Sequence, residues 1–299
     1  MAISPMALAT AIVDGLALGG LYALVAVSFN VLYRPTNVFN FAQGELVMLG
    51  AMLGALVMGA TGLGFWTAAP VVLAAVGALC LVQGRLTVEP VLRRSSVSHS
   101  WLITTLAFSM IVVNAVNLIW SSDPIRVAPP WPLGTRAIVW DGVLRTSTYK
   151  LAVIAAAIGL TLLVERAYRS RLGLAVQAVA EDREAALLRG IRPDRLARLS
   201  FFAGGALAGL AGLMAAPIMF ASTGLGATLL FKGFAAAAIG GIGSNRGALL
   251  AGLTIGVVES LGILFLSPGY QLAVVFLLFL IVLMIRPQGL FGRIEERHV

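Results

Sequence analysis

The stretch Ala9–Leu32, ATAIVDGLALGGLYALVAVSFNVL, decides the class of fold to which this chain belongs. It contains a single charged residue, Asp14, and a helix of about 20 apolar residues is long enough to cross the hydrocarbon core of a bilayer. The first Lys or Arg of the chain is Arg34, after this stretch, whereas a cleaved signal peptide has positive charge before its apolar segment. We therefore expect Ala9–Leu32 to be a first transmembrane helix that is retained.

The rest of the chain has the same apolar character. Of its 299 residues, 59% are apolar and 11% are charged, and the mean hydropathy is +0.95. A soluble domain has about 25% charged residues and cannot bury so much apolar surface. The composition argues against a soluble enzyme and against a nucleic-acid-binding protein. It predicts an all-α polytopic membrane protein, and we expect residues 1–299 to form a single transmembrane domain.

Charged residues and Gly/Pro clusters divide the chain into about eight to nine transmembrane helices. The predicted spans are Ala9–Leu32, Asn40–Ala60, Trp66–Gly84, Trp101–Trp120, Tyr149–Val164, Leu199–Ser222, Leu229–Gly243, Gly247–Leu266 and Tyr270–Ile285. A polar loop is expected between the third and fourth spans, and a longer loop, rich in Pro and Trp, over Ser121–Thr148. The seventh span is rich in Gly and Ala, and it either crosses the membrane or re-enters it.

The distribution of positive charge predicts the orientation, because cytoplasmic loops carry an excess of Lys and Arg. The net charge of the chain is +8. With the Arg-rich segment 165–198 in the cytoplasm, 16 Lys and Arg residues lie on the inner side and 4 on the outer side. This split predicts an N-terminus outside and a C-terminus in the cytoplasm. It requires Leu229–Gly243 to cross the membrane.

The segment Glu165–Arg198 holds eight Arg and five acidic residues, so it is too polar to cross a membrane. Within it, Leu172–Gly190 consists mostly of strong helix formers, which predicts one short amphipathic helix at the cytoplasmic face. Gly190 can supply the positive φ of a helix C-cap, and Pro193 blocks further helix. On residue chemistry alone, a solvated interfacial helix held by lipid headgroups explains this pattern as well as a docking element does.

Several motifs resemble one known family, the branched-chain amino acid permeases of ATP-binding-cassette (ABC) importers. The segment EDREAALLRGI (Glu181–Ile191) looks like the EAA-type coupling motif of importer permeases. The other matching pieces, in the order of the family, are GGLYAL (19–24), NFAQGE (40–45), FKGF (231–234) and GGIGS (240–244). One departure is Gln43, where the family pattern has His, so a pH-sensing role at this position is in doubt.

The resemblance implies a function and a set of partners. In that family two membrane subunits pair, as a homodimer or a heterodimer, and each rests a cytoplasmic helix on one of two ATPase subunits. An extracytoplasmic binding protein delivers the solute, most often a branched-chain or other hydrophobic amino acid, to the bacterial inner membrane. The residues that would transmit the ATPase motion are Glu181, Asp182, Glu184, Ala185, Ala186, Gly190 and Ile191.

The chain itself is expected to be a transport subunit and not an enzyme. A phosphate-binding P-loop needs Gly-x-x-x-x-Gly-Lys-[Ser/Thr], and neither Lys150 nor Lys232 stands in that context. We therefore expect this chain to bind no cofactor, with ATP and Mg²⁺ on the partner subunits. The main alternative is an ion-coupled secondary transporter of small organic solutes. A membrane enzyme is disfavoured, because His99 and His298 are far apart and Cys80 is the single cysteine.

Charged side chains inside apolar spans need an explanation, because a charge at the bilayer centre costs about 2.5–3.5 kcal/mol on insertion scales. Asp14 and Glu45 lie near the ends of their spans and can reach headgroups, whereas Glu259 lies deep. Lys232 and Glu259 either line the translocation path, form a pair between the seventh and eighth spans, or hold helices together. We leave these alternatives open.

Polar and small residues complete the picture. Asn37, Asn40 and Gln43 place hydrogen-bonding groups at the start of the second span, either along the path or between helices, and Asn40 is first of all a candidate N-cap. Four Gly-x-x-x-Gly pairs predict close helix packing: Gly15/Gly19, Gly50/Gly54, Gly205/Gly209 and Gly252/Gly256. The run Gly240–Gly243 predicts either a helix break aimed at the path or a plain turn.

Overall fold

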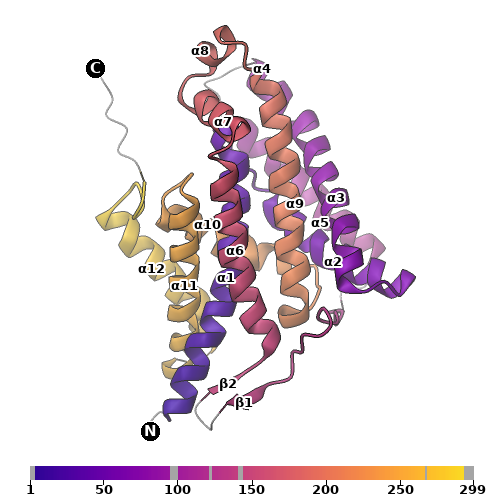
Figure 1. Ribbon diagram of the computed structural model, residues 1–299, viewed down its shortest axis with the longest axis vertical. Coiled ribbons are helices and arrows are strands. Elements are labelled where there is room, and N and C mark those ends of the chain that lie inside the picture. The colour runs from indigo at the N-terminus through magenta and orange to yellow at the C-terminus, as the bar shows by residue number, and fades with distance from the viewer. Residues whose placement is uncertain (1–3, 95–99, 121–122, 141–143, 267, 293–299) are drawn as a thin grey trace. The chain divides into compact units, whose positions relative to one another are not determined.

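The structure is a computed structural model that describes residues 4–94, 100–120, 123–140, 144–266 and 268–292 (Figure 1). In chain order its α-helices are α1 (Pro5–Thr36), α2 (Gln43–Thr61), α3 (Phe65–Gln83), α4 (Glu89–Arg94), α5 (Ser100–Ile119), α6 (Thr148–Ala167), α7 (Arg171–Glu181), α8 (Arg183–Leu188), α9 (Pro193–Met219), α10 (Leu225–Gly240), α11 (Asn245–Phe265) and α12 (Gln271–Ile285). A π-helix, η1 (Gly84–Val88), joins α3 to α4, and a 3-10 turn, η2 (Pro268–Tyr270), precedes α12.

The helices confirm an all-α polytopic membrane protein. In the described part of the chain, seven helical stretches are long and apolar enough to cross a membrane: α1, α2, α3 continued to Val91, α5, α6, α9 and α11. Two more apolar helices, α10 and α12, are shorter. These nine elements correspond to the nine predicted spans. The crossing of α10 stays a prediction, because its 16 residues rise only about 24 Å as an α-helix.

The chain divides into two compact units. One comprises Met1–Val27, Leu133–Leu163 and Phe231–Val299, and the other comprises Ser28–Pro132 and Val164–Leu230. We call them the first and the second unit. The prediction of one transmembrane domain over residues 1–299 is not tested by this division.

In the first unit, α1 packs against α11 through the predicted glycine pairs. A Cβ atom on Gly15 would lie 2.6 Å from the Gly256 carbonyl oxygen, and one on Gly19 would lie 2.5 Å from the Gly252 oxygen. No side chain fits at such distances, so these helices meet backbone to backbone. The α10 helix ends at Gly240, and Gly241 and Gly243 have φ of 91° and 82°. The run Gly240–Gly243 is therefore a turn that breaks the helix before α11.

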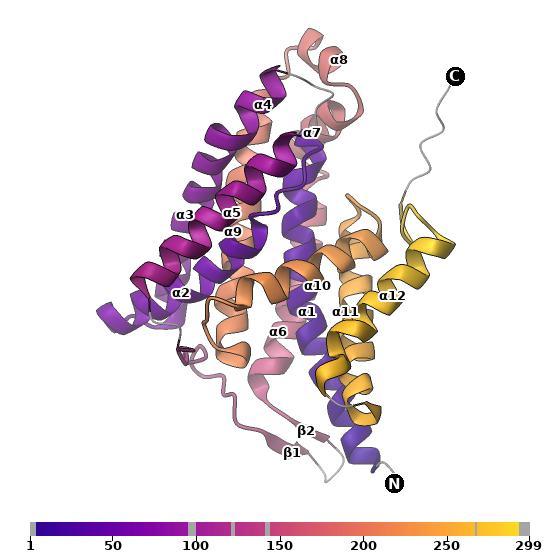
Figure 2. The same cartoon turned by 180° about the vertical axis from the view of Figure 1, so that it is seen from behind.

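In the second unit, α2, α3 and α9 lie side by side in both views (Figures 1 and 2). Glycine again allows the contact. A Cβ atom on Gly50 would collide with the backbone of Gly209, and one on Gly205 would collide with Cys80. The predicted close packing of these Gly-x-x-x-Gly pairs is thus confirmed.

Three local predictions differ from the structure. The sequence predicted a polar loop after the third span, but the chain stays helical up to Arg94 through η1 and α4. Long charged side chains near the end of a membrane helix can reach the polar interface, so they do not require a loop. His99 lies outside the described residues. The helix α1 also continues through Pro35 and ends only before Asn37, whose φ is 53°. The loop Ser121–Thr148 contains a short antiparallel pair, β1 (Ile138–Trp140) and β2 (Leu144–Thr146).

Candidate functional site

The polar segment 165–198 of the second unit contains two short helices, α7 and α8, whereas the sequence predicted one over Leu172–Gly190. The chain turns at Asp182, where φ is −150° and ψ is 108°. The Asp182 carboxylate accepts hydrogen bonds from the backbone N–H groups of Glu184 and Ala185, both at 2.9 Å. Asp182 is therefore the N-cap of α8. The prediction of one helix was wrong because the helix formers on both sides of Asp182 favour a continuous helix, whereas the Asp182 side chain caps the start of a second one.

The end of α8 confirms the predicted role of Gly190. Its φ is 82°, and its N–H donates to the Leu187 carbonyl at 2.9 Å. The Ile191 N–H donates to the Ala186 carbonyl at 3.0 Å. These two bonds form a Schellman motif, which ends a helix with a left-handed glycine. Pro193 then begins α9, so the polar segment 165–198 overlaps the ends of α6 and α9.

The tip formed by α8 is polar at its start and apolar toward its end. Glu181, Asp182 and Glu184 are exposed, whereas Ala186 is buried. Leu187 and Leu188 are 53% and 91% exposed. Sequence reasoning missed these two leucines, although an apolar pair inside an Arg-rich segment is a readable signal. Exposed apolar side chains in a polar setting are typical of a contact surface.

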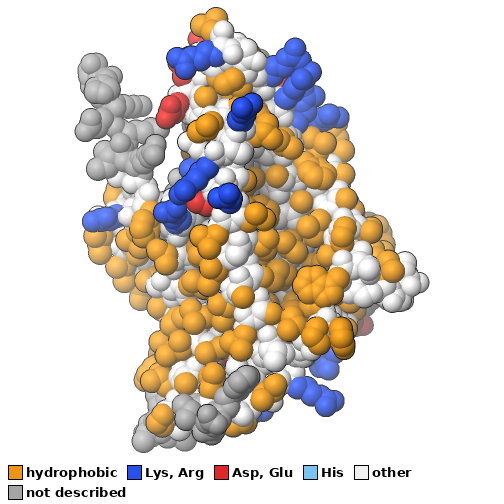
Figure 3. All heavy atoms as spheres, in the orientation of Figure 1, with side chains coloured by type: hydrophobic (Ala, Val, Ile, Leu, Met, Phe, Trp, Pro, Cys, Tyr) orange, Lys and Arg blue, Asp and Glu red, His pale blue; other side chains and the backbone are white. Residues whose placement is uncertain are grey.

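Basic side chains surround this tip (Figure 3). Arg171, Arg183 and Arg189 are exposed on α7, on α8 and just after α8. The Arg183 guanidinium pairs with the Asp194 carboxylate at 2.6 Å and so joins α8 to the first turn of α9. Both side chains are about half exposed, so this pair adds little to the link that the short segment 189–192 makes between α8 and α9.

Another contact joins the polar segment 165–198 to α1. The Arg34 guanidinium lies 4.3 Å from the centre of the Tyr168 ring, within the range of a cation–π interaction. The Gln177 side chain of α7 donates to the Tyr168 carbonyl at 3.0 Å. The pKa of the Tyr168 hydroxyl is raised to about 12, because the effect of burial exceeds the opposite effect of the nearby Arg34 charge. The ring is therefore neutral at physiological pH and serves as a packing surface for Arg34.

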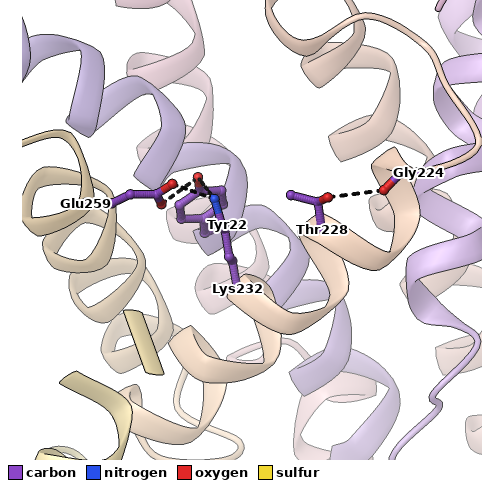
Figure 4. A network of polar contacts seen from close by, with 5 residues as sticks. All are labelled: Tyr22, Gly224, Thr228, Lys232 and Glu259. Carbon is purple, nitrogen blue, oxygen red and sulfur yellow. Dashed lines mark hydrogen bonds and ion pairs between the residues drawn. The ribbon is translucent and has the colours of Figure 1, made fainter. Parts of the chain in front are cut away.

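The charged cluster of the first unit consists of Tyr22, Lys232 and Glu259, on α1, α10 and α11. Figure 4 shows the three side chains pointing toward one another. The Lys232 ammonium lies 2.5 Å from Glu259 Oε1, and the Tyr22 hydroxyl donates to Glu259 Oε2 at 2.9 Å. Lys232 also donates to the Tyr22 oxygen at 3.1 Å. The predicted Lys232–Glu259 pair is present, and Tyr22 is a third member that the sequence did not indicate.

The amide cluster of the second unit consists of Asn40, Gln43 and Gln83, all fully buried, with the Ser28 hydroxyl and the Gly204 carbonyl. Asn40 and Gln83 exchange two hydrogen bonds, at 2.8 and 2.6 Å. Gln43 donates to the Ser28 hydroxyl at 2.9 Å and to the Gly204 carbonyl at 3.0 Å. These residues therefore join α1, α2, α3 and α9 by neutral hydrogen bonds.

The predicted N-cap at Asn40 is wrong. The N-cap position of α2 is Ala42, and no side chain caps it. The Asn40 oxygen instead accepts from the Ala42 N–H at 3.1 Å, which is the local bond of an Asx turn. Its amide is thereby free to pair with Gln83, 43 residues away. Asn37 is exposed and lies outside this cluster.

The remaining charged residues of the spans are placed as follows. Asp14 pairs with Lys150 at 2.6 Å, and both side chains are about one-third exposed. Glu45 lies in the first turn of α2 and is 5% exposed, and its Oε2 atom has no hydrogen-bond partner among the residues that the structure describes. Among the described residues, no group of three or more His, Cys, Asp or Glu side chains could hold a metal ion.

Comparison with known proteins identifies the family. A family model described as "Branched-chain amino acid transport system / permease component" matches residues 11–283. The chain belongs to this family. No solved structure matches this permease.

Relatives of this permease cover almost its whole length. The high-affinity branched-chain amino acid transport system permease protein LivH of Salmonella typhimurium is 30% identical, over 96% of each chain. The BraD permease protein of Pseudomonas aeruginosa, named for the same kind of system, is 32% identical over 96% of this chain and 97% of its own. The LivM permease protein of Salmonella typhimurium is 27% identical over 90% of this chain and 67% of its own. The protein is thus a multi-pass transport permease subunit, and an ion-coupled secondary transporter is not favoured.

Proposed function

We propose that this permease subunit forms the translocation path of an ABC importer for branched-chain or other hydrophobic amino acids. The observation that carries the proposal is the match of its family over residues 11–283, together with relatives named for high-affinity branched-chain amino acid transport. The membrane is the bacterial inner membrane, with the N-terminus outside and the C-terminus in the cytoplasm. The excess of Lys and Arg on the loops of one side supports this orientation.

The proposed assembly contains a second permease subunit, two ATPase subunits and an extracytoplasmic binding protein. The existence of LivH and LivM as separate permease proteins supports a heterodimer. No P-loop sequence occurs in this chain, so ATP and Mg²⁺ bind to the ATPase subunits and this chain binds no cofactor. The lipid bilayer surrounds the apolar helices, and no nucleic acid is involved.

The α8 tip is the proposed contact with an ATPase subunit. Leu187 and Leu188 enter a groove of the ATPase, and Glu181, Asp182 and Glu184 lie at the polar rim of the contact. The buried Ala186, the half-buried Ala185 beside it and the Gly190–Ile191 turn hold the tip in shape. Motion of the ATPase then reaches α9 through the short connection 189–192 and reaches α1 through Tyr168 and Arg34. The buried side chains of Asn40, Gln43, Lys232 and Glu259 hold the helices in place.

The test is reconstitution of the chain with its ATPase, permease and binding-protein partners in proteoliposomes. We expect ATP-dependent uptake of leucine, isoleucine and valine, and stimulation of ATP hydrolysis by the loaded binding protein in a panel of ligands. An ion-coupled carrier would instead transport without the ATPase, and an uncoupler would abolish that transport. If no ATPase associates with the chain, the proposal fails.

Two variants separate coupling from folding. Gly190→Asp should abolish uptake while the protein still inserts into the membrane, because a side chain at a φ of 82° distorts the end of α8. Gly243→Asp is the matched control: Gly243 also has a φ of 82°, and neither glycine has an atom within 4 Å of an added Cβ. We expect Gly243→Asp to retain most of the uptake. Normal uptake by Gly190→Asp would contradict the coupling role.

A further inference from the structure

Within the nine spans predicted from the sequence, the acidic residues are Asp14, Glu45 and Glu259, and one of them differs from the other two. Asp14 has Lys150 as its cation, and Glu259 has Lys232. Glu45 has no Lys, Arg or His within ion-pair distance among the residues that the structure describes. One of its carboxylate oxygens, Oε2, has no hydrogen-bond partner at all. Glu45 is nevertheless among the most buried acidic residues, at 5% exposure.

A buried carboxylate without a cation is costly, so it either takes up a proton or receives a cation. Glu45 lies in the first turn of α2, where the N-terminal end of the helix carries partial positive charge. The Ser109 hydroxyl of α5 donates a hydrogen bond to its carboxyl group. Neither the helix N-terminus nor Ser109 donates a hydrogen bond to Oε2. This oxygen can therefore accept a hydrogen bond from a donor outside the described part of the chain.

The helix that supplies Ser109 has few buried residues within this chain. In α5 only 11% of the membrane-spanning window is buried, the lowest share among the seven long spans. A transporter with alternating access closes its site from water during part of its cycle. Burial of Glu45 beneath α5 is what such a closed state requires.

We propose that Glu45 accepts the ammonium group of the amino-acid substrate during its passage through the permease. This inference rests on the proposed function, because that substrate class always carries the cation that Glu45 lacks. A hydrogen bond between an ammonium group and a carboxylate is short and about twice as strong as a neutral one. A site built around such a bond rejects analogues that lack the donor. Glu45 thus selects amino acids over the corresponding uncharged or purely anionic solutes.

The first arm of the test is leucine uptake by the complete complex in proteoliposomes. Glu45→Gln keeps the size and the bond to Ser109 but removes the charge, and we expect uptake to fall at least about tenfold. Asp14→Asn is the matched control, because it neutralises a carboxylate that already has its own lysine, and its uptake should stay within about twofold of the unaltered complex. Unchanged uptake by Glu45→Gln would overturn the inference. An uncharged amide can replace a protonated carboxyl group with a structural role, but it cannot replace a carboxylate that binds an ammonium group.

The second arm uses the unaltered complex, so it does not depend on the folding of a variant. Dicyclohexylcarbodiimide modifies protonated carboxyl groups in apolar surroundings, and mass spectrometry of the peptide that contains Glu45 measures the modification. During ATP-driven turnover, saturating leucine should protect Glu45. The keto acid 4-methyl-2-oxopentanoate has the same side chain and carboxylate without the ammonium group, and it should not protect. Equal labelling with and without leucine would overturn the inference.

The two arms also separate this inference from the proposed function. If the unaltered complex takes up no branched-chain amino acid, the proposed function fails and the role of Glu45 falls with it. If the unaltered complex takes up leucine, and Glu45 is neither needed nor protected, only the role of Glu45 fails.

Discussion

The charged cluster (Tyr22, Lys232 and Glu259) and the amide cluster (Asn40, Gln43 and Gln83 with their partners) both hold membrane helices together through buried polar groups. The first contains a full positive and a full negative charge 2.5 Å apart. The second contains no charge, and its amides share their bonds among several partners. Both are almost completely closed to solvent.

The difference lies in what remains when one member is removed. A buried ion pair is balanced only as a pair, so the loss of one partner leaves an uncompensated charge. An amide network loses the bonds of one residue while its other members keep theirs. The loss of one member should therefore lower the free energy of unfolding much more in the charged cluster than in the amide cluster, and four substitutions test this difference.

The largest effect is expected for Lys232→Met. It leaves the Glu259 carboxylate buried at 2% exposure with only the Tyr22 hydroxyl as a donor, and breaking a buried pair costs about 3–5 kcal/mol. Unfolding of the purified protein in mixed detergent micelles measures the loss of stability. The double variant Lys232→Met/Glu259→Leu removes both charges and should regain most of the lost stability. A double variant as unstable as the single one would show that the pair does not act as a unit.

A smaller effect is expected for Gln43→Leu. The substitution removes the two bonds that Gln43 donates, to Ser28 and to the Gly204 carbonyl. It also removes the bond that the Gln43 oxygen accepts from the Asn40 amide at 3.3 Å, while Asn40 and Gln83 keep their exchange. The expected cost is about 1–3 kcal/mol in the same unfolding measurement. Asn114→Leu is the control, because Asn114 is an exposed amide that bonds only within its own helix. A loss for Gln43→Leu as large as that for Lys232→Met would remove the distinction between the clusters.

The two clusters also differ in how far the sequence predicts them. Lys232 and Glu259 could be paired because they are the two charges of neighbouring predicted spans, and each needs a partner in an apolar setting. The sequence does not predict the contact of Tyr22 with this pair, because a tyrosine in an apolar span needs no charged neighbour. Gln83 ends an apolar run and Asn40 begins another, so nothing local shows that they meet across 43 residues. Long-range packing decides such contacts.

The polar segment 165–198 shows the same limit at short range. Gly190 was predictable as a helix end, because only a glycine adopts its φ without strain and Pro193 follows closely. The break at Asp182 was not, because the helix formers on both sides of it favour continuation. An Asp within such a run either faces solvent from one helix or caps a second one. The propensities of the run do not distinguish the two outcomes.

A still smaller effect is expected for Tyr22→Phe. The ring stays in place, so packing is unchanged, and the Lys232–Glu259 pair remains. Only the bond from the Tyr22 hydroxyl to Glu259 and the bond that it accepts from Lys232 are lost. The unfolding free energy should fall by about 1 kcal/mol. A fall as large as that for Lys232→Met would mean that the hydroxyl, and not the lysine, balances Glu259.

The smallest effect is expected for Asp14→Asn, which breaks the ion pair with Lys150. The chemistry is that of the Lys232–Glu259 pair, but these side chains are 31% and 29% exposed, so water screens both charges. An accessible pair of this kind contributes less than about 1 kcal/mol, and the contribution should shrink further as salt is raised, because the Debye length falls to about 3 Å at 1 M. Unfolding of Asp14→Asn and of the unaltered protein at low and high salt measures both effects. If Asp14→Asn destabilises the protein as much as Lys232→Met does, then the large loss of stability in the charged cluster comes from breaking an ion pair as such, and not from its burial.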